Sequence, residues 1–138
     1  MNPILRNILG IVVGWIAGSI LNGSLIMMGH KIYPIEGIDT NNREELAAVM
    51  PGLDFNYFIF PFLAHALGTL VGAAVAAKIA VNHKMKFALA IGVLFLIGGI
   101  IACFMIPAPS WFITLDLILA YIPMAWLGGK IGMGISKK

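Results

Sequence analysis

Two ionisable side chains stand in the middle of long apolar segments of this sequence, where a charge is rare. His65 lies in the segment FLAHALGTLVGAAVAAKIA, and Asp116 lies in the segment SWFITLDLILAY. An aspartate at the centre of a membrane helix raises the free energy of insertion by about 2.5 to 3.5 kcal/mol, so it is expected to face the protein interior and find a partner. A carboxylate beside an imidazole allows proton transfer, or the binding of a cation or small polar ligand.

The depths of these two residues predict that they meet. At 1.5 Å per helical residue, His65 lies about 13 Å from the end of its segment near Asn56, and Asp116 lies about 9 Å from the end of its segment near Ser110. We therefore expect the two side chains within hydrogen-bond reach, directly or through one water, so that they titrate as a coupled unit. The alternative interpretation is a hydrogen bond between helices that only fixes their register.

Further polar residues are expected at a similar depth. Asn22 or Thr69 is predicted to lie beside the pair, and Tyr121 belongs to the same layer. Pro61 and Pro123 each remove a helix hydrogen bond, so each is expected to kink its helix or to free a carbonyl toward this layer. The candidate residues for a ligand site or proton pathway are thus His65, Asp116, Asn22, Thr69 and Tyr121, with Ser19, Ser24 and Thr114 as further polar members of the layer.

No catalytic residue, metal site or cofactor is predicted. The sequence contains no HExxH or CxxC spacing, and His30 and His83 lie at the ends of apolar segments, far from His65. Cys103 is the only cysteine and stands in an apolar run, which is typical of an inert, small hydrophobic residue. No serine or cysteine lies beside a base in a nucleophile motif. These absences favour a protein that is not an enzyme.

The composition requires a membrane environment for the elements that hold these residues. Of 138 residues, 60% are hydrophobic and 11% are charged, whereas soluble domains average about 45 to 50% apolar and about 25% charged residues. A soluble globular enzyme and a disordered chain are both excluded. A helix needs about 20 apolar residues to cross a bilayer, and four segments are long enough, at about 4–28, 55–81, 85–106 and 111–132.

We therefore predict an all-α fold, a four-helix transmembrane bundle that forms a single membrane domain over residues 1–138. The first apolar segment exceeds the roughly 7 to 15 residues of a signal-peptide core, so it is expected to be a permanent helix. Its surroundings are the lipid bilayer. A nucleic-acid partner is not expected, because the basic residues form no stripe with interleaved aromatic residues.

The basic residues predict the orientation of the helices. Only Lys31 and Arg43 lie in the loop 29–54 between the first two helices. The other seven flank the two termini and the turn between the second and third helices, namely Arg6, Lys78, Lys84, Lys86, Lys130, Lys137 and Lys138. Because basic residues are enriched on the cytoplasmic side, we expect a multi-pass protein of the cell inner membrane with both termini in the cytoplasm.

The outer loop 29–54 contains the pattern of a short amphipathic helix. Asn41 or Asn42, followed by Glu44 or Glu45, resembles a capping box, and Pro51 marks the end. Apolar residues then recur with helical spacing, at Leu46, Val49, Met50 and Leu53. The apolar side of this helix is expected on the membrane surface or over the outer end of the bundle.

Small residues recur at every fourth position of the first two apolar segments, a pattern known as a glycine zipper. The first series is Gly10, Gly14 and Gly18, and the second is Ala64, Gly68, Gly72, Ala76 and Ala80. In lipid, helices associate largely through the close approach of backbones at such residues. The two series therefore predict closely packed helices, first of all within one chain and alternatively between chains.

Three stretches of this sequence carry a resemblance to known proteins: GHKIYPIEGID at residues 29–39, FLAHALGTLVGAAVAAKIA at 62–80 and PAPSWF at 107–112. The chain resembles a widespread group of small, uncharacterised bacterial four-span membrane proteins in which G-H-x-x-Y-P…G-x-D follows the first helix. The resemblance covers nearly the whole chain and implies the same architecture, without an activity. The positions that match the motif are His30, Tyr33, Pro34, Gly37 and Asp39.

Two classes of function follow from these observations. The leading hypothesis is a non-enzymatic helix bundle or a subunit of a larger membrane complex. The alternative is a small transporter or channel, working as a homo-oligomer because four helices seldom enclose a wide path, with His65 and Asp116 as its proton or cation site. A membrane enzyme acting on a lipid-soluble substrate has the least support. A water-accessible cavity that reaches the polar layer would favour the transporter.

Overall fold

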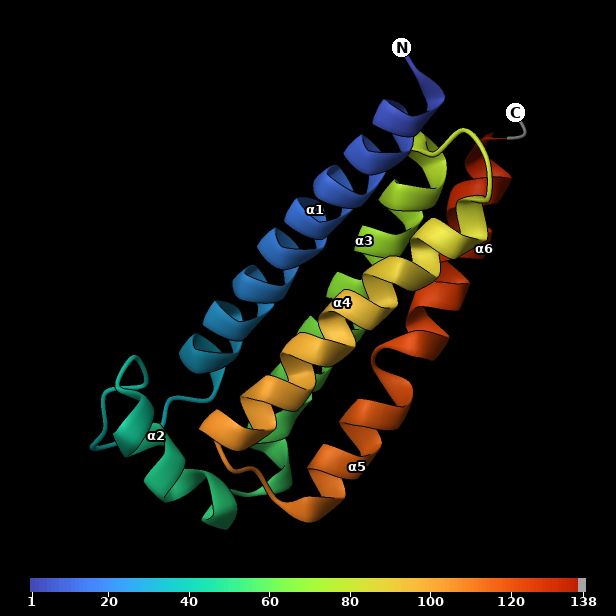
Figure 1. The fold of residues 1–138 in the computed structure, drawn as a ribbon. Coiled ribbons are helices and arrows are strands. Elements are labelled where there is room, and N and C mark those ends of the chain that lie inside the picture. The colour runs from blue at the N-terminus through green and yellow to red at the C-terminus, as the bar shows by residue number, and fades with distance from the viewer. Residues whose placement is uncertain (137–138) are drawn as a thin grey trace.

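A computed structural model describes residues 1–136, and its helices form the predicted all-α bundle (Figure 1). Lys137 and Lys138, which we counted among the inner basic residues, lie outside these residues. The described part of the chain contains no β-strand. Its helices are α1 (Pro3–Ile32), α2 (Arg43–Val49), α3 (Ile59–Ile79), α4 (Lys84–Met105), α5 (Ser110–Leu119) and α6 (Ile122–Ser136), with short 3-10 turns η1 (Met50–Gly52) and η2 (Phe55–Phe58).

Within residues 1–136, four helical segments are long and apolar enough to cross a membrane: Pro3–Ile32, Phe55–Ile79, Lys84–Met105 and Ser110–Gly134. The first runs four residues beyond the predicted end at residue 28, because no proline lies between that residue and Pro34. On the face of α1 that is turned away from the other helices, large apolar side chains are exposed, among them Ile8, Val12, Ile16 and Ile20. Such a surface belongs in lipid, so the chain is a multi-pass membrane protein.

The fourth span, predicted over 111–132 with a kink at Pro123, is interrupted in the structure next to that proline. It is divided at Ala120 and Tyr121 into α5 and α6. Pro123 explains the division, because it has no N–H and its ring collides with the carbonyl four residues earlier in a continuous helix. The expected kink at Pro61 was wrong. Pro61 is the third residue of α3, where backbone N–H groups have no partner within the helix.

Helix α3 lies at the centre of the bundle, with α1 on one side and α6 on the other (Figure 1). The two series of small residues meet between α1 and α3 of the same chain. A Cβ atom added to Gly14 would lie 2.5 Å from the Gly72 carbonyl oxygen, and one added to Gly18 would lie 2.5 Å from the Gly68 carbonyl oxygen. Any side chain at these positions would force the two backbones apart.

Glycines of the fourth span produce the same kind of contact on the opposite side of α3. A Cβ atom at Gly128 would collide with the Leu70 carbonyl oxygen. On the neighbouring helix α4, a Cβ atom at Gly92 would lie 2.6 Å from the Ala125 Cβ atom. Helices α3, α4 and α6 are therefore held at short distances by residues that lack bulk.

Hydrogen bonds join the start of α1 to the end of α3. The Arg6 side chain donates from Nε to the Ile79 carbonyl oxygen at 2.8 Å. The Asn7 amide donates to Asn82 Oδ1 at 2.8 Å and accepts from the Val81 N–H at 2.8 Å. In the sequence analysis Arg6 indicated only the orientation of the chain. In the structure it also donates to a carbonyl oxygen at the end of α3, where the last carbonyls of a helix have no N–H partner within the helix.

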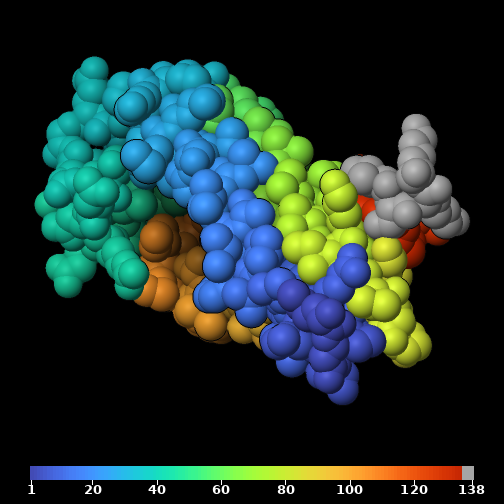
Figure 2. Space-filling model, turned by 90° about the horizontal axis from the view of Figure 1, so that it is seen from above, coloured from blue at the N-terminus to red at the C-terminus, as the bar shows by residue number. Residues whose placement is uncertain are grey.

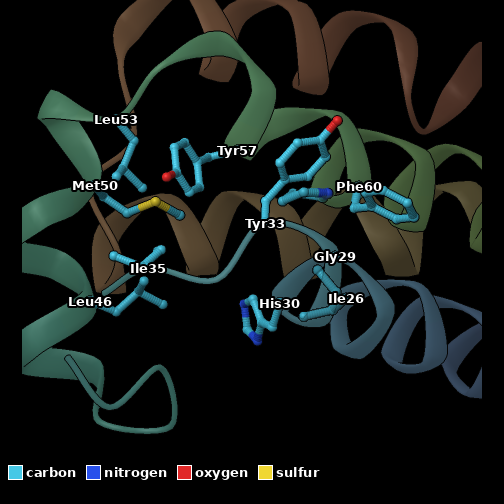
Figure 3. Close-up of a pocket in the computed structure, with 11 residues that line it drawn as sticks. Ile26, Gly29, His30, Tyr33, Ile35, Leu46, Met50, Leu53, Tyr57 and Phe60 are labelled. Atoms are coloured by element: carbon cyan, nitrogen blue, oxygen red, sulfur yellow. The ribbon is translucent and has the colours of Figure 1, made fainter. Parts of the chain in front are cut away.

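The segment 33–58 between α1 and α3, named the outer segment after the side predicted for it, folds over the adjacent end of the bundle. Asn42 caps α2 by accepting the Glu44 N–H at 3.1 Å, and Glu45 accepts the Asn42 side-chain amide at 3.0 Å. Figure 3 shows apolar side chains of this segment around a small cavity of about 40 Å³. The cavity is lined by residues from α1, the outer segment and the start of α3, including His30, Tyr33, Leu46, Met50, Leu53, Tyr57 and Phe60. Of the two predicted locations, α2 therefore occupies the one over the bundle.

Candidate intramembrane site

His65 of α3 and Asp116 of α5 are in direct contact. The His65 Nδ1 atom lies 2.9 Å from Asp116 Oδ1 and 3.0 Å from Asp116 Oδ2. Asp116 is 4% exposed, so its carboxylate depends on protein donors in place of water. The prediction that these two side chains lie within hydrogen-bond reach is confirmed, and no bridging water is required.

Tyr121 is the second donor to the same carboxylate. Its hydroxyl donates to Asp116 Oδ2 at 3.0 Å, and its ring stacks on the His65 ring with centroids 5.8 Å apart and an interplanar angle of 26°. Residues three and four apart face each other on a continuous helix, whereas residues five apart do not. The break at Ala120 and Tyr121 is therefore what allows the tyrosine to turn back toward the aspartate.

A glycine on the neighbouring helix makes room for this arrangement. A Cβ atom at Gly99 of α4 would collide with the Tyr121 hydroxyl. Tyr121 is 1% exposed, so a side chain at position 99 would displace the hydroxyl from its place beside Asp116. Gly99 is thus part of the site through the volume it leaves empty, although its sequence position indicated only a small residue in an apolar helix.

The hydrogen bonds determine which nitrogen of His65 faces away from the aspartate. An ionised carboxylate only accepts hydrogen bonds, so Nδ1 must carry the proton that it shares with Asp116. The other nitrogen, Nε2, lies on the opposite side of the ring and has no hydrogen-bond partner among residues 1–136. In the neutral ring Nε2 is an acceptor. With a neutral ring, the site therefore presents an acceptor nitrogen on an imidazole that is oriented by a buried carboxylate.

A cavity of about 270 Å³ adjoins His65. Its lining comes from α1, α3, α4 and the break in the fourth span, namely Asn22, His65, Phe95, Gly98, Gly99, Ala102 and Tyr121. The His65 side chain is 22% exposed, whereas the Asp116 side chain is 5% exposed. The imidazole therefore lies between the cavity and the carboxylate.

The remaining predicted polar residues divide into one that shares the cavity and several that do not. Asn22 lines the cavity, and its side chain makes no hydrogen bond within the described part of the chain. Thr69 is fully buried and donates to the His65 backbone carbonyl at 2.7 Å, and it makes no hydrogen bond to the His65 ring or to the Asp116 carboxylate. Ser24 and Thr114 likewise donate to carbonyls of their own helices. Short hydroxyl side chains commonly satisfy themselves in this way.

The charge of the site depends on His65 and Asp116. Across residues 1–136, the contact between His65 and Asp116 is the only ion pair, and it is one only when His65 is protonated.

No protein-family model, curated protein or solved structure matches this chain. The geometry of the site is therefore the basis for its chemistry. No group of three histidine, cysteine, aspartate or glutamate side chains comes together in the described residues, so the site has no ready-made ligand set for a metal ion.

Four residues of the cavity were not predicted as site residues: Phe95, Gly98, Gly99 and Ala102. Each is apolar or small in an apolar helix, so nothing in its type distinguishes it from a residue that packs against lipid. The adjacent pair Gly98 and Gly99 was the available signal. Gly99 accommodates Tyr121, and a Cβ atom at Gly98 would meet no atom within 4 Å.

Proposed function

We propose that this chain is a non-enzymatic membrane protein in which His65 and Asp116 form the proton site of a small transporter or channel. The observation that carries the proposal is the cavity beside His65, which lies against the imidazole while Asp116 orients the imidazole from the other side. Ionisable residues within membrane helices characteristically belong to proton relays or ion pathways. Because four helices seldom enclose a complete path, we further propose that the protein works as a homo-oligomer.

The pair is suited to accept and release one proton. A proton from water in the cavity would bind to Nε2, and the resulting imidazolium would be stabilised by the adjacent carboxylate. The Tyr121 hydroxyl remains bonded to Asp116 in either state, which keeps the carboxylate in place. Charging the imidazole thus produces a neutral pair and avoids an isolated buried cation.

Proton flux into proteoliposomes tests this proposal. The purified chain is reconstituted with a pH-sensitive dye inside the vesicles, and a pH step is applied with valinomycin and potassium to clamp the membrane potential. We expect the internal pH to change faster than in protein-free vesicles of the same lipid. A rate equal to that of protein-free vesicles would contradict the proposal.

A second candidate function is a structural bundle or a subunit of a larger membrane complex. The observation in its favour is that Asp116 accepts bonds from both His65 and Tyr121, and thereby joins α3 to the two halves of the fourth span. In that case the pair determines helix register and passes no proton. The two candidates differ in what happens when only the charge of Asp116 is removed.

We propose a bacterial inner membrane location with both chain ends in the cytoplasm. The start of α1, the turn between α3 and α4 and the end of α6 lie at one end of the bundle (Figure 1), and the basic residues Arg6, Lys84 and Lys130 belong to this half of the molecule. The excess of basic residues at that end supports the cytoplasmic assignment. The resemblance of GHKIYPIEGID to the motif of small bacterial four-span proteins supports the bacterial membrane, and the glycine contacts between α1 and α3 support a glycine zipper within the chain.

Cysteine labelling tests this orientation. In a Cys103→Ala background, we expect Lys86→Cys in the first turn of α4 to be protected from a membrane-impermeant thiol reagent in intact cells. Glu36→Cys in the outer segment should react. Both native side chains are exposed and make no hydrogen bond in the structure, so neither substitution removes a packing contact. Lys86→Cys must react after the cells are permeabilised. Labelling at position 86 with protection at position 36 would invert the orientation.

A further inference from the structure

The cavity beside His65 is large enough for a small organic molecule. Its volume is about 270 Å³, compared with about 150 Å³ for an engineered protein cavity that binds benzene. Asn22 is the twentieth residue of the thirty-residue helix α1, so at 1.5 Å per residue it lies about 15 Å from the outer end of that helix. The cavity is therefore at a depth where a ligand would be surrounded by the bundle and by lipid.

Two polar groups of the lining have no partner in the described part of the chain. These are Nε2 of His65, which is an acceptor in the neutral ring, and the side-chain amide of Asn22, which both donates and accepts. A ligand that satisfies Nε2 must carry an N–H or O–H donor. The carboxylate of Asp116 already accepts two hydrogen bonds, so it acts on a ligand through its charge.

The charge of the site favours a positive ligand. When His65 is neutral, the Asp116 carboxylate carries one negative charge that no cation compensates. Near the depth of the site, the other titratable groups on the surrounding elements are Tyr121 and the Cys103 thiol of α4, and neither is positive. The basic residues of α1 and α4 lie toward the helix ends: His30 and Lys31 are about 12 to 14 Å along α1 from Asn22, and Arg6, Lys84 and Lys86 lie at the opposite end of the bundle. The nearest basic residue on α3 is Lys78, thirteen residues or about 20 Å along the helix from His65. A cation in the cavity would therefore be attracted with little competition.

The walls of the cavity suit an organic cation. Phe95 and Tyr121 contribute aromatic rings, and aromatic rings attract cations through the negative potential of their faces. Gly98 contributes no side chain, and open space lies next to it. In Figure 2, orange atoms near the outer end of α4 are set back between α1 (blue) and the outer segment (teal). An apolar body could lie against Phe95 and the open space beside Gly98 while the charged group lies near His65.

We propose that this cavity binds a small organic ammonium ion, a protonated primary amine on an apolar body. The ammonium group donates to His65 Nε2 and to the Asn22 side-chain oxygen, and its charge is balanced by Asp116. A proton on Nε2 would remove both the acceptor and the net negative charge, so the ammonium ion and this proton exclude each other. This inference rests on the proposed function, because it names a substrate class for the same site.

Binding of benzylammonium to the full chain in lipid nanodiscs tests the inference, with benzyl alcohol as the uncharged analogue of nearly the same shape. A hydrogen bond that involves a charged group contributes about 1.5 to 3 kcal/mol, which is about tenfold or more in affinity. We therefore expect saturable binding of benzylammonium, one per chain, with an affinity at least about tenfold higher than that of benzyl alcohol. Equal affinities for the two compounds would overturn the inference.

A matched pair of glycine variants locates the binding site. Gly98 lines the cavity and Gly23 of α1 does not, and a Cβ atom at either position meets nothing within 4 Å. Both Gly98→Leu and Gly23→Leu should therefore fold. We expect Gly98→Leu to abolish benzylammonium binding by filling the cavity and Gly23→Leu to leave it unchanged. Unchanged binding in Gly98→Leu would show that the ligand lies elsewhere, and would also overturn the inference.

Flux and binding together separate this inference from the proposed function. If proton flux is present and depends on Asp116 but benzylammonium does not bind, the ammonium site is wrong and the proton site stands. If benzylammonium binds to the unmodified chain and not to Gly98→Leu, but no proton flux occurs, the ammonium site stands and proton transport is wrong.

Discussion

The substitution Asp116→Asn is expected to lower proton flux through reconstituted vesicles by at least about tenfold, while the bundle loses no more than about 1.5 kcal/mol of stability. Asparagine has nearly the shape of aspartate and retains an oxygen that can accept from Tyr121 or from His65 Nδ1. It has no negative charge, so a proton on His65 would become an isolated buried cation. Flux is measured with the pH-sensitive dye, and stability by thermal unfolding of the same preparation in detergent.

The control variant for this experiment is Thr114→Val. It removes a polar group from the same helix, two residues before Asp116, and valine has nearly the same shape as threonine. The Thr114 hydroxyl donates to the Ser110 carbonyl of its own helix and makes no hydrogen bond to a residue of the site, so flux should be unchanged. If Asp116→Asn folds and conducts protons like the unmodified chain, the carboxylate takes no part in transfer and the structural role of the pair is favoured.

The pair itself could be predicted because membrane helices make charge conspicuous. Within segments that are otherwise apolar, His65 and Asp116 stand out by type, and a fixed rise per residue gives their depth. The same reasoning predicted Asn22, which does line the cavity. The sequence did not show that Thr69, unlike Asn22, lies outside the cavity lining. A buried threonine can donate to a carbonyl of its own helix, and no sequence pattern indicates that it does so.

The role of Tyr121 required the structure. Five residues separate it from Asp116, which places the two side chains on different faces of a continuous helix. Pro123 predicted a kink, but a kink can turn the chain in several directions. Only the break that the structure shows brings the tyrosine hydroxyl to Asp116 Oδ2. Gly99 supplies the space for it, and a glycine in an apolar helix does not reveal which side chain will occupy the space it leaves.

The cavity could not be predicted from the sequence for a related reason. A cavity is a volume that side chains do not fill, and its boundaries depend on the distances between helices to within a methyl group. Periodic small residues predicted that α1 and α3 would be close, but they did not predict that α1 and α4 would leave a space beside His65. The opposite end of the bundle shows the same limit, since the bonds of Arg6 and Asn7 to the end of α3 depend on how α1 is seated.

The substitutions Gly14→Leu and Gly72→Leu are each expected to destabilise the bundle by about 3 kcal/mol or more, at or above the upper end of what an overpacked core costs. The reason is that the added side chain would meet backbone, which has no alternative rotamer. A Cβ atom at Gly14 would lie 2.5 Å from the Gly72 carbonyl oxygen, and one at Gly72 would lie 2.7 Å from the Gly14 carbonyl oxygen. Thermal unfolding in detergent measures the effect.

Two controls separate close packing from a general intolerance of leucine. Gly23→Leu introduces the same side chain on α1, at a position with no atom within 4 Å of the new Cβ. It should be neutral or stabilising, because glycine is a poor helix former. Val93→Leu enlarges a side chain that is 46% exposed on α4, and should change stability by less than about 0.5 kcal/mol. If all four variants unfold at the same temperature, the glycines do not mark a close contact.

The same glycine contacts also connect stability to the site. A Cβ atom at Gly68 would lie 3.1 Å from the Asn22 Cβ atom, and one at Gly18 would lie 3.0 Å from the Phe95 ring. Both Asn22 and Phe95 line the cavity beside His65, so the distance between α1 and α3 also sets the position of α1 against the cavity. A variant that separates these helices without unfolding the protein should therefore alter benzylammonium binding, even though no substituted residue touches the ligand. Gly10→Ala is the suitable variant, because its Cβ atom would meet the Ala76 carbonyl oxygen at 3.1 Å, at the far end of the same helix pair.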